Sequence, residues 1–333
     1  MNNLRNPDSI SIAMATYNGA PYLKEQLDCF NEQSILPNEL IICDDGSTDE
    51  TINVIESFQK YAPFNVKFIQ NQTRLGYGKN FEKALNNTTG DLIFLSDQDD
   101  VWFPNKIEEI INVVGQNPDK DLFLNDTEIT DAKLNPTGLT KLGQIKRTSL
   151  SLDNFVQGSC ACLTRQLADI ALPIPENIKA HDNWISDIAR YLDIRYIHNE
   201  VLQYYRIHER NTSNYMANRT KKLNRSTGIF NQRNASRATT EHKMNSDIHY
   251  KKQINSRLRE LHSSVISGHI SSDAIAEAQK RIDEYIDVLN TRLDIRNSNM
   301  ITRIHSGFAM YIDGQYQEHF NGALSLTKDI FRT

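Results

Sequence analysis

The first 125 residues alternate short apolar runs with segments of helical periodicity, and this alternation limits the fold more than any other feature. The apolar runs, rich in Ile, Leu and Val, predict strands at residues 10–15, 39–43, 66–70, 91–96 and 121–125. The segments between them predict helices at residues 20–33, 49–61, 78–88 and 104–116. Because parallel strands need a crossover, this order is typical of an α/β fold with a mostly parallel sheet flanked by helices.

The formal net charge of −5 is unevenly distributed along the 333 residues. Residues 1–214 carry 19 Lys and Arg against 30 Asp and Glu, whereas residues 215–333 carry 18 against 12. A content of 39% hydrophobic and 24% charged residues is that of an ordinary folded protein. We therefore expect an acidic α/β domain at 1–214, with halves at 8–125 and 126–214, and a basic region at 215–333.

The basic region combines a Lys-, Arg- and Asn-rich linker with apolar residues at helical spacing. These are Ile254, Leu258, Leu261 and Val265, and then Ile275, Ile282, Ile286, Leu289 and Leu293. The pattern predicts a C-terminal helical extension of two or more amphipathic helices. Its role is open between a solvated helical subdomain, which ranks first, contact with an acidic membrane surface, and a surface for a partner helix.

Several classes of protein are disfavoured by what the sequence lacks. No apolar stretch approaches the roughly 20 residues of a membrane-spanning helix, and the polar start at residues 1–6 has no signal-peptide core. We expect a cytoplasmic protein, with peripheral contact to the inner face of the membrane as an option. Cys29, Cys43, Cys160 and Cys162 lack paired spacing and predict reduced, buried thiols. The negative charge and the absence of a recognisable module argue against a nucleic-acid partner.

Polar residues follow each predicted strand, where a sheet of this kind binds its ligand. They are 16–19 after the first strand, 44–47 after the second, 71–79 after the third and 96–102 after the fourth. Asp44 and Asp45 can accept hydrogen bonds from a base or a ribose hydroxyl, and the following Gly46 lets a backbone approach closely. The alternative for this pair is a simple turn that caps the next helix.

The acidic run at residues 97–100 follows the apolar residues 92–95, so several carboxylates crowd together at the rim of the sheet. This crowding is unfavourable unless a cation compensates it. Mg²⁺ or Mn²⁺ binds one or two carboxylates and takes its other ligands from water and phosphates, and Asp99 is the first-choice ligand. A solvated acidic loop is the alternative, although the adjoining Val101, Trp102 and Phe103 argue against it.

Two later segments carry further candidates. Asp182, at the start of a predicted helix, can act as a general base, but its spacing alone favours a helix cap. Arg206 and His208 lie just past a strand-like segment at 201–205 and can close over a diphosphate. Arg206 would do so by charged hydrogen bonds, and His208 as a metal ligand or a hydrogen-bond donor. A structural pair at the strand end is an equal alternative.

The chain resembles the family 2 glycosyltransferases of the GT-A fold over residues 8 to about 213. The resemblance rests on residues 11–19 (SIAMATYNG), 42–49 (ICDDGSTD) and 96–102 (SDQDDVW), which occur in the family's order. It implies that Ala15, Tyr17 and Asp45 contact the nucleoside, that Asp97 lies near the ribose and diphosphate, and that Asp99 binds the metal. Thr16, Asn18, Asp44, Gly76, Lys79 and Gln98 complete the predicted nucleotide-binding set, and Asp100 is expected to be structural.

The same resemblance assigns the acceptor side of the site. Gly158 resembles the family's glycine-containing loop, and His181 and Asp182 fall where its catalytic acidic residue is expected, so that Asp182 becomes the predicted base. Gly158, His181, Trp184 and Arg206 form the predicted acceptor and diphosphate side. The amino-acid sequence of residues 96–102, 181–184 and 205–213 most resembles the rhamnosyltransferase-like branch of this family.

The expected function is a metal-dependent, inverting glycosyl transfer. The donor would be a dTDP- or UDP-linked sugar, such as rhamnose or another hexose or N-acetylhexosamine. The acceptor would be a glycan or a lipid-linked glycan of a cell-surface polysaccharide such as capsule or O-antigen, and the cofactor Mn²⁺ or Mg²⁺. Two alternatives remain: a nucleotidyltransferase that makes an activated sugar, disfavoured because residues 16–22 lack a glycine-rich basic loop, and a non-catalytic nucleotide- or sugar-binding module.

Overall fold

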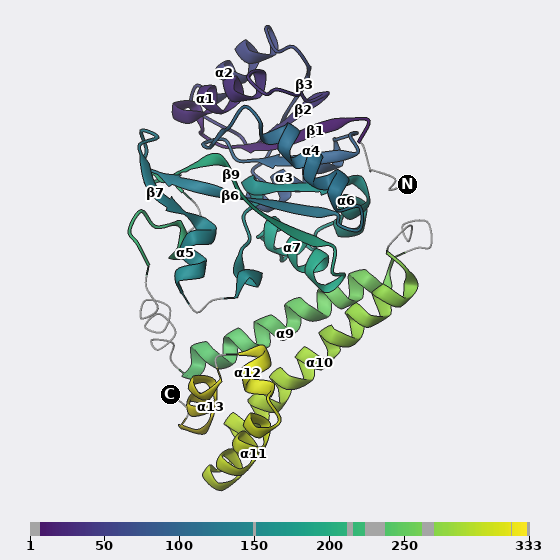
Figure 1. Ribbon diagram of the computed structural model, residues 1–333, viewed down its shortest axis with the longest axis vertical. Coiled ribbons are helices and arrows are strands. Elements are labelled where there is room, and N and C mark those ends of the chain that lie inside the picture. Colours follow the sequence, from purple (N-terminus) through teal and green to yellow (C-terminus); the bar gives the residue numbers. More distant parts are fainter. Residues whose placement is uncertain are drawn as a thin grey trace. The chain divides into compact units, whose positions relative to one another are not determined.

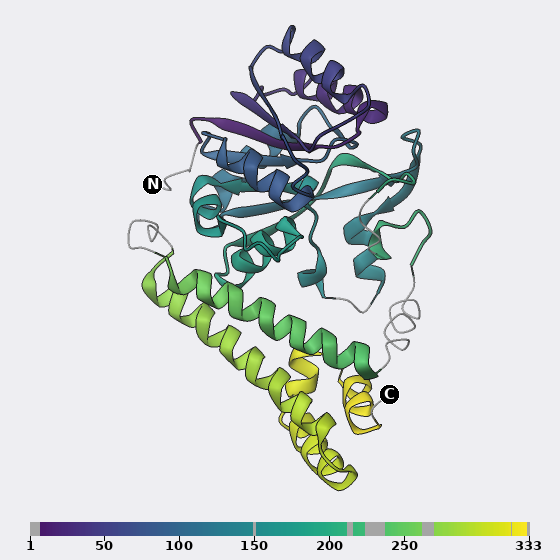
Figure 2. The same cartoon turned by 180° about the vertical axis from the view of Figure 1, so that it is seen from behind.

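The computed structural model describes residues 7–148, 151–211, 216–223, 237–261, 270–320 and 322–331. The chain divides into two compact units, Met1–Gly228 (unit 1) and Ile229–Thr333 (unit 2). Figure 1 and the reverse view in Figure 2 show an α/β unit and a helical unit. The boundary expected between residues 214 and 215 lies outside the described residues.

Unit 1 is built on a sheet whose strand order in the described residues is β3-β2-β1-β4-β8-β6-β9-β5, with β7 paired to β6. Its first part is parallel and consists of β1 (Ile10–Thr16), β2 (Glu39–Asp44), β3 (Asn65–Gln70) and β4 (Leu92–Ser96). The connecting helices are α1 (Ala20–Asn31), α2 (Thr51–Gln59), α3 (Tyr77–Asn86) and α4 (Lys106–Gln116). These strands and helices confirm the elements predicted from the sequence, with ends shifted by one or two residues.

The apolar runs of β1, β2 and β4 become strands that are covered on both faces, whereas β3 is partly exposed. Every residue of β4 is buried, and Ile12 of β1, Ile42 of β2 and Phe94 of β4 belong to one hydrophobic core. Helix α1 adds Leu27 and Phe30 to the same core. Strands covered on both faces show continuous apolar runs rather than alternation, which is why they were visible in the sequence. The carboxyl ends of β1, β2 and β4 consequently meet at one edge of the sheet.

The segment at 126–214 contributes much of the sheet. Strand β6 (Leu122–Thr130) continues past its predicted end, and β7 (Pro136–Thr140), β8 (Ala161–Thr164) and β9 (Arg195–Arg206) follow. Strand β8 runs antiparallel between β4 and β6, and β9 pairs in parallel with β6 and antiparallel with the short β5 (Val101–Trp102). The strand-like segment predicted at 201–205 forms the end of β9, whereas β8, only four residues long, was not predicted.

Three helices accompany this second part of the sheet: α5 (Lys141–Arg147), α6 (Arg165–Ala171) and α7 (His181–Tyr191). Helix α7 buries Trp184, Ile185 and Ile188, and this amphipathic pattern fixes how the helix is rotated about its axis. Its first turn carries His181 and Asp182. Burial of the apolar face therefore orients the polar residues at its start.

Unit 2 contains the helices α9 (Arg237–Arg259), α10 (Ser272–Asn297), α11 (Met300–Ile312), α12 (Gln315–His319) and α13 (Ala323–Phe331). The predicted apolar positions Ile254, Leu258, Ile275, Ile282, Ile286 and Leu289 are buried, which confirms a helical extension. Leu261 lies past the end of α9, and Val265 is outside the described residues. Asp329 is fully buried and accepts bonds from Arg292 Nε at 2.6 Å and Arg296 Nη1 at 3.1 Å.

Two further expectations can be compared with the structure. Within the described residues, no helix has the length and apolarity that crossing a membrane requires. The cysteines are all free and buried, as predicted. Burial raises the pKa of Cys29 and of Cys160 to about 12, so these thiols stay protonated at neutral pH and are poor nucleophiles.

Candidate active site

A cavity of about 1080 Å³ opens at the carboxyl ends of the parallel strands of unit 1. It brings together most of the residues singled out from the sequence: Ala15, Thr16, Tyr17, Asn18, Asp45, Gly76, Asp97, Gln98, Asp99, Gly158, His181, Asp182 and His208. We divide its lining into a loop wall (residues 15–18, 45 and 74–76) and an acidic wall (Asp97, Asp99, His181, Asp182 and His208). These residues come from separate parts of the sequence, and only the sheet makes them neighbours.

Asp44 and Asp45 lie side by side in the chain but have different surroundings. Asp44 is fully buried, and its carboxylate accepts bonds from Thr16 Oγ1, the backbone N–H groups of Gly46 and Ser47, and Ser47 Oγ at 2.5–3.1 Å. It is not among the residues that line the cavity. The short side chain of Asp44 turns into the loop and holds its backbone instead.

Asp45 lines the cavity and organises the loop opposite. Its oxygens accept the backbone N–H groups of Leu75 at 2.6 Å and Gly76 at 2.8 Å. Gly76 has φ +83°, a backbone conformation that disfavours a side chain, and it precedes α3. Arg74 packs over the Tyr17 ring, with its Cζ 3.9 Å from the ring centroid. The carboxylate of Asp45 thus fixes the loop wall through the backbone of residues 75 and 76.

The loop after β1 is held in place by side-chain amides. Gln98 accepts the backbone N–H of Tyr17 at 2.9 Å and donates to its carbonyl oxygen at 3.1 Å. Asn18 accepts the backbone N–H of Thr48 at 2.8 Å and adopts a positive φ of 48°. Both bonds of Gln98 to Tyr17 tie the acidic run to the loop wall, so the two walls are connected at this point.

The acidic run is as crowded as the sequence suggested. Burial raises the pKa of Asp97 well above its usual value, and the charges of Asp99, Asp100 and Asp182 raise it further. Burial and the charge of Asp99 likewise raise the pKa of Asp100 to about 7. Asp100 is fully buried and accepts a bond from Gln203 Nε2 at 2.9 Å, away from the cavity lining. Two acidic side chains, Asp97 and Asp99, thus remain on the cavity side, and Asp97 holds its proton more strongly than a free carboxyl group does.

His208 contacts this acidic run directly. Its Nε2 lies 2.7 Å from Asp99 Oδ2, and both side chains are largely buried, with exposed fractions of 6% and 14%. The ring stacks on Tyr22 with 4.5 Å between centroids, and its Nδ1 accepts the backbone N–H of Arg210 at 3.1 Å. Because Nδ1 accepts a bond, the hydrogen of the neutral ring lies on Nε2 and faces Asp99.

The donor set of this wall suits a hard divalent cation. Asp99 Oδ2 and His208 Nε2 are close enough for one Mg²⁺ or Mn²⁺, with bonds of about 2.1 Å, to contact both in place of the hydrogen. In the described part of the chain, no cluster of three or more His, Cys, Asp or Glu side chains is arranged as a complete ligand set. The protein would supply two ligands, and phosphates and water the others, which is the usual habit of Mg²⁺.

Asp182 is a further carboxylate on the cavity lining. It belongs to the first turn of α7, where the helix dipole favours a negative charge, and its Oδ1 accepts the backbone N–H of Asn183 at 2.9 Å. His181 precedes it, with its ring stacked on Phe81 at 4.0 Å. The built Cβ position at Gly158 lies 3.5 Å from Asp182 Cβ, so the expected glycine-containing loop does reach this helix.

Three other predicted site residues do not line the cavity. Lys79 Nζ donates to Ile174 O at 2.6 Å and pairs with Glu82 at 2.7 Å, so its charge is used on the outer side of α3. Trp184 is fully buried and donates to Ala171 O at 2.8 Å. The assignment of Lys79 to the nucleotide and of Trp184 to the acceptor is therefore wrong, since each side chain points into neighbouring protein.

Arg206 is also displaced from its expected place over a diphosphate. Its guanidinium donates to Asp99 O at 2.9 Å and Ala132 O at 3.0 Å, and it pairs with Glu25. It is buried and does not line the cavity. Arg206 thus braces the backbone of the acidic run from behind, which corrects the predicted direct contact.

Several residues of the site were missed in the sequence. Tyr205 lines the cavity, and burial raises its pKa well above the usual value. Lys106 is fully buried beneath the acidic run; its Nζ donates to Ser159 O at 3.1 Å and to Gln203 Oε1, and burial lowers its pKa to about 8. A buried lysine at the start of a helix has no sequence signal that separates it from a surface lysine.

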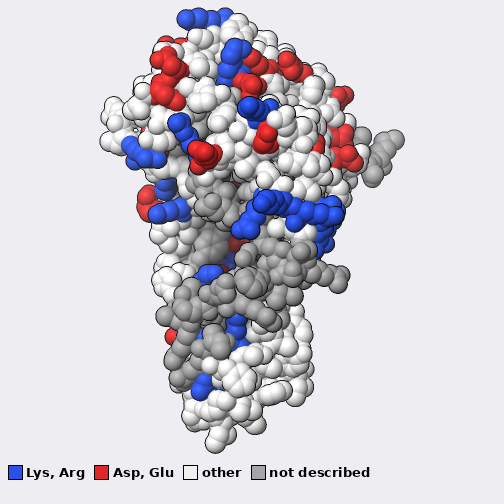
Figure 3. All heavy atoms as spheres, turned by 90° about the vertical axis from the view of Figure 1, so that its left-hand side faces the viewer, with Lys and Arg blue, Asp and Glu red and all other residues white. Residues whose placement is uncertain are grey.

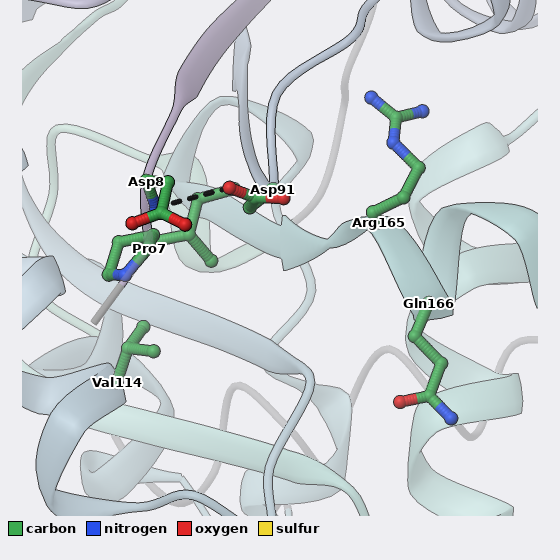
Figure 4. Close-up of a pocket in the computed structure, with 7 residues that line it drawn as sticks. Pro7, Asp8, Asp91, Val114, Arg165 and Gln166 are labelled. Atoms are coloured by element: carbon green, nitrogen blue, oxygen red, sulfur yellow. Dashed lines mark hydrogen bonds between the residues drawn. The ribbon is translucent and has the colours of Figure 1, made fainter. Parts of the chain in front are cut away.

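A smaller hollow of about 280 Å³ lies at the other end of the strands and is shown in Figure 4. Asp91, just before β4, accepts the backbone N–H groups of Asp8 and Ser9, both at 3.1 Å. Arg165 donates to Gly90 O and to Thr88 Oγ1, and in Figure 4 its guanidinium points away from Asp91. These charges hold backbone in place, so this hollow is a structural joint and the large cavity is the candidate active site.

Comparisons with known proteins agree on the class that this fold and cavity define. Residues 11–155 match the family described as glycosyl transferase family 2. The chain is 38% identical over 103 residues to the dTDP-rhamnosyl transferase RfbG of Shigella flexneri, covering 30% of this chain and 36% of that protein. It is 27% identical over 107 residues to the amylovoran biosynthesis glycosyltransferase AmsB of Erwinia amylovora, covering 32% and 36%. The matches thus span about a third of the length of these curated relatives.

Solved structures show the same fold. The crystal structure of S. aureus TarS 1–349 in complex with UDP has a TM-score of 0.52 and 17% sequence identity, covering 83% of this chain and 90% of that one. At this identity the likeness concerns the fold alone. The chain has the GT-A fold, with a mixed, mostly parallel sheet and C-terminal helices. Over residues 11–155 its sequence is similar to that of the family 2 glycosyl transferases.

Proposed function

We propose that the chain transfers a sugar from a nucleoside-diphosphate donor to a hydroxyl group of a glycan or lipid-linked glycan, with inversion at the anomeric carbon. The observation that carries the proposal is that one cavity contains the Asp99–His208 pair, the carboxylate of Asp182 and the loop wall. A donor binding site, a place for a cation and a base are the components that such a transfer requires. The biosynthesis of a surface polysaccharide is the process in which we place it.

The loop wall is the proposed site of the nucleoside. Residues 15–18 offer backbone groups at the end of β1, and Arg74 over Tyr17 closes the wall. Gly76 leaves its side open, since a Cβ there would meet nothing within 4 Å. We infer a dTDP- or UDP-linked donor because RfbG is described as a dTDP-rhamnosyl transferase and TarS was solved with UDP. Rhamnose is the first sugar to test.

The acidic wall is the proposed site of the reaction. Asp182 accepts the proton of the acceptor hydroxyl while that oxygen attacks the anomeric carbon, and the bond from this carbon to the diphosphate oxygen breaks. The pair of electrons leaves with the nucleoside diphosphate. A single displacement of this kind inverts the anomeric configuration. Asp182 lines the cavity from the first turn of α7, where the helix dipole favours a negative charge.

Asp99 and His208 are the proposed ligands of Mn²⁺ or Mg²⁺, with Asp97 beside them. Such a cation, when bound, neutralises the charge that develops on the departing diphosphate. Arg206 and Gln98 hold the acidic run on its two sides, through Asp99 O and Tyr17. These two residues keep the ligands in place.

The proposal is tested by screening nucleotide sugars with Mn²⁺ or Mg²⁺ for release of the nucleoside diphosphate. dTDP-rhamnose and UDP-linked hexoses come first, and chelation by EDTA should stop the release. Pyrophosphate formed from a nucleoside triphosphate and a sugar phosphate would instead support a nucleotidyltransferase. Binding of donors without any turnover would support a non-catalytic binding module.

We also propose that unit 2 contacts a membrane surface, where a lipid-linked acceptor would be found. Helix α11 exposes Ile301 (82%), Phe308 (51%) and Ile312 (79%), while Gly307 packs closely against Leu326 of α13. Helix α11 contains Arg303 but no Asp or Glu, and Figure 3 shows one face of the molecule with Lys and Arg in blue and Asp and Glu in red. An exposed apolar helix face without acidic residues is typical of helices that lie in the membrane interface.

Cosedimentation with vesicles containing anionic lipid tests this contact. Replacing Ile301 and Phe308 by Ser should reduce the bound fraction severalfold, because the apolar face that inserts between the lipids is lost. Replacing the exposed Tyr61 of unit 1 by Ser is the matched control and should leave binding unchanged. Equal binding of all variants would contradict the proposal, and a concentration-dependent dimer that Ile301→Ser abolishes would assign the same face to a second copy.

A further inference from the structure

His181, the first residue of α7, is an unusual member of the acidic wall. It lines the cavity although only 4% of its surface is exposed. Its ring stacks on Phe81, with 4.0 Å between centroids and 24° between planes, and meets the Tyr77 ring edge-on at 6.2 Å. These carbon contacts fix the plane of the imidazole, so they also fix the directions in which its nitrogens point.

The two nitrogens of this ring are the second unusual feature of His181. Neither Nδ1 nor Nε2 of His181 has a hydrogen-bond partner among the described residues. Burial lowers the pKa of His181, an effect that exceeds the opposing attraction of Asp182. A neutral imidazole offers one N–H donor and one acceptor nitrogen, and leaving both unpaired in a buried place is unfavourable. The ligand of the cavity is the natural partner for them.

One of these nitrogens lies beside the proposed base. A Cβ on Gly158 would lie 3.0 Å from His181 Nε2 and 3.5 Å from Asp182 Cβ. Such a contact is closer than a side chain normally makes, so the glycine allows the imidazole to lie where it does, next to Asp182. The unpaired nitrogens are therefore held in a place beside the proposed base.

The chemistry of the surroundings selects the kind of group that can occupy this place. An anion such as phosphate would need a protonated imidazole, which burial disfavours, and it would face the carboxylates of Asp97 and Asp182. A hydroxyl group is neutral and can both donate and accept, so it matches a neutral imidazole. Sugars present hydroxyl groups next to the reacting carbon and oxygen atoms.

We propose that His181 binds a sugar hydroxyl in the cavity, and thereby positions the sugar against Asp182. This inference rests on the proposed glycosyl transfer. The hydroxyl belongs to the donor sugar or to the acceptor sugar, and the two sources have the same chemistry at this nitrogen. His181 acts as a specificity-determining residue of the reaction, whereas Asp182 takes the proton.

The test compares two substitutions in the full chain with Mn²⁺. His181→Phe keeps an aromatic face against Phe81 and removes both nitrogens, so kcat/KM should fall about tenfold or more. Its thermal unfolding temperature should stay the same or rise, because a buried imidazole without partners is replaced by an apolar ring. His181→Gln keeps a donor and an acceptor and should recover part of kcat/KM.

Gly158→Ala provides an independent arm, since its Cβ would press on His181 Nε2 from 3.0 Å and displace the ring without removing its nitrogens. It should also lower kcat/KM. Donor hydrolysis in the absence of acceptor separates the two sources of the hydroxyl. A loss of hydrolysis in His181→Phe assigns the hydroxyl to the donor, and unchanged hydrolysis with a raised acceptor KM assigns it to the acceptor.

The inference is overturned if His181→Phe has the kcat/KM of the wild type. It is overturned equally if the variant loses activity and thermal stability together and His181→Gln rescues neither, since His181 would then be merely structural. These results differ from a failure of the proposed function, in which the wild type itself would release no nucleoside diphosphate from dTDP-rhamnose or from UDP-linked sugars.

Discussion

The two walls of the cavity differ in how far their polar groups are satisfied by the protein. In the loop wall, both oxygens of Asp45 accept backbone N–H groups, and Asn18 and Gln98 bond to backbone as well. In the acidic wall, Asp97 carries a raised pKa and both nitrogens of His181 lack partners among the described residues. A carboxylate that accepts hydrogen bonds from the backbone holds the site in shape. A polar group without protein partners is available to bind a ligand.

This difference also separates carboxylates that look alike in the sequence. Asp44 and Asp45 are adjacent, as are Asp99 and Asp100, yet one member of each pair is fully buried and outside the cavity lining. Asp44 holds the turn after β2, and Asp100 bonds to Gln203. In each pair the other member lines the cavity. Substitutions in the two walls should therefore have different consequences.

The largest effect is expected for Asp182→Asn. The variant keeps the size of the side chain but cannot accept the acceptor's proton, so kcat should fall by about 10²–10⁴-fold. UDP affinity, measured by calorimetry, should stay within a factor of about two because the loop wall is unchanged. Asp187→Asn, farther along α7 and paired with Arg190, is the matched control. Normal turnover by Asp182→Asn would show that Asp182 is not the base.

A smaller effect is expected for Asp99→Asn, which weakens one of the two proposed metal ligands. The affinity for Mn²⁺ in the presence of UDP should fall by about ten- to a hundredfold, by analogy with losses in other metal sites. Titration of Mn²⁺ followed by electron paramagnetic resonance measures it directly. Asp28→Asn, in an exposed pair with Lys24, serves as the control. Unaltered Mn²⁺ affinity would show that the Asp99–His208 pair is a hydrogen bond only.

Asp45→Asn tests the loop wall. The amide can accept one backbone N–H but not both, so the loop at 74–76 should loosen and UDP affinity should fall by about tenfold. The free energy of unfolding should drop by about 1–3 kcal/mol, the usual loss for bonds to a charged acceptor. Calorimetry and urea unfolding measure the two quantities. At saturating donor, kcat should be preserved. A strongly lowered kcat would show that the loop wall also contributes to the reaction and would contradict the proposed difference between the two walls.

The smallest effect on ligand binding is expected for Asp44→Asn. Its carboxylate is buried and accepts donors from Thr16, Gly46 and Ser47, so the free energy of unfolding should again fall by about 1–3 kcal/mol. UDP affinity, measured below the unfolding transition, should change by less than about threefold. Urea unfolding with and without UDP gives both numbers. A loss of affinity equal to that of Asp45→Asn would mean that Asp44 contacts the ligand after all.

The sequence by itself determined the parallel half of the sheet and the acidic residues at its rim. Buried strands need continuous apolar runs, and the ligand edge is the carboxyl edge of such strands, so both features follow from local pattern. The runs at 10–15, 39–43 and 91–96 became β1, β2 and β4, and Asp45, Asp97 and Asp99 line the cavity. The helices of the C-terminal region were predictable for the same reason.

Only the tertiary structure decided which of these side chains face the cavity. A strand end or a first helical turn can turn a residue inward or outward, and the direction depends on packing between distant segments. Trp184 donates a hydrogen bond to Ala171 of α6, and Lys79 donates one to the segment at 174–176. Arg206 pairs with Glu25 and donates to the backbone oxygen of Asp99. The unpartnered nitrogens of His181 belong to the same category, because the absence of a partner is a property of the surroundings and not of the sequence.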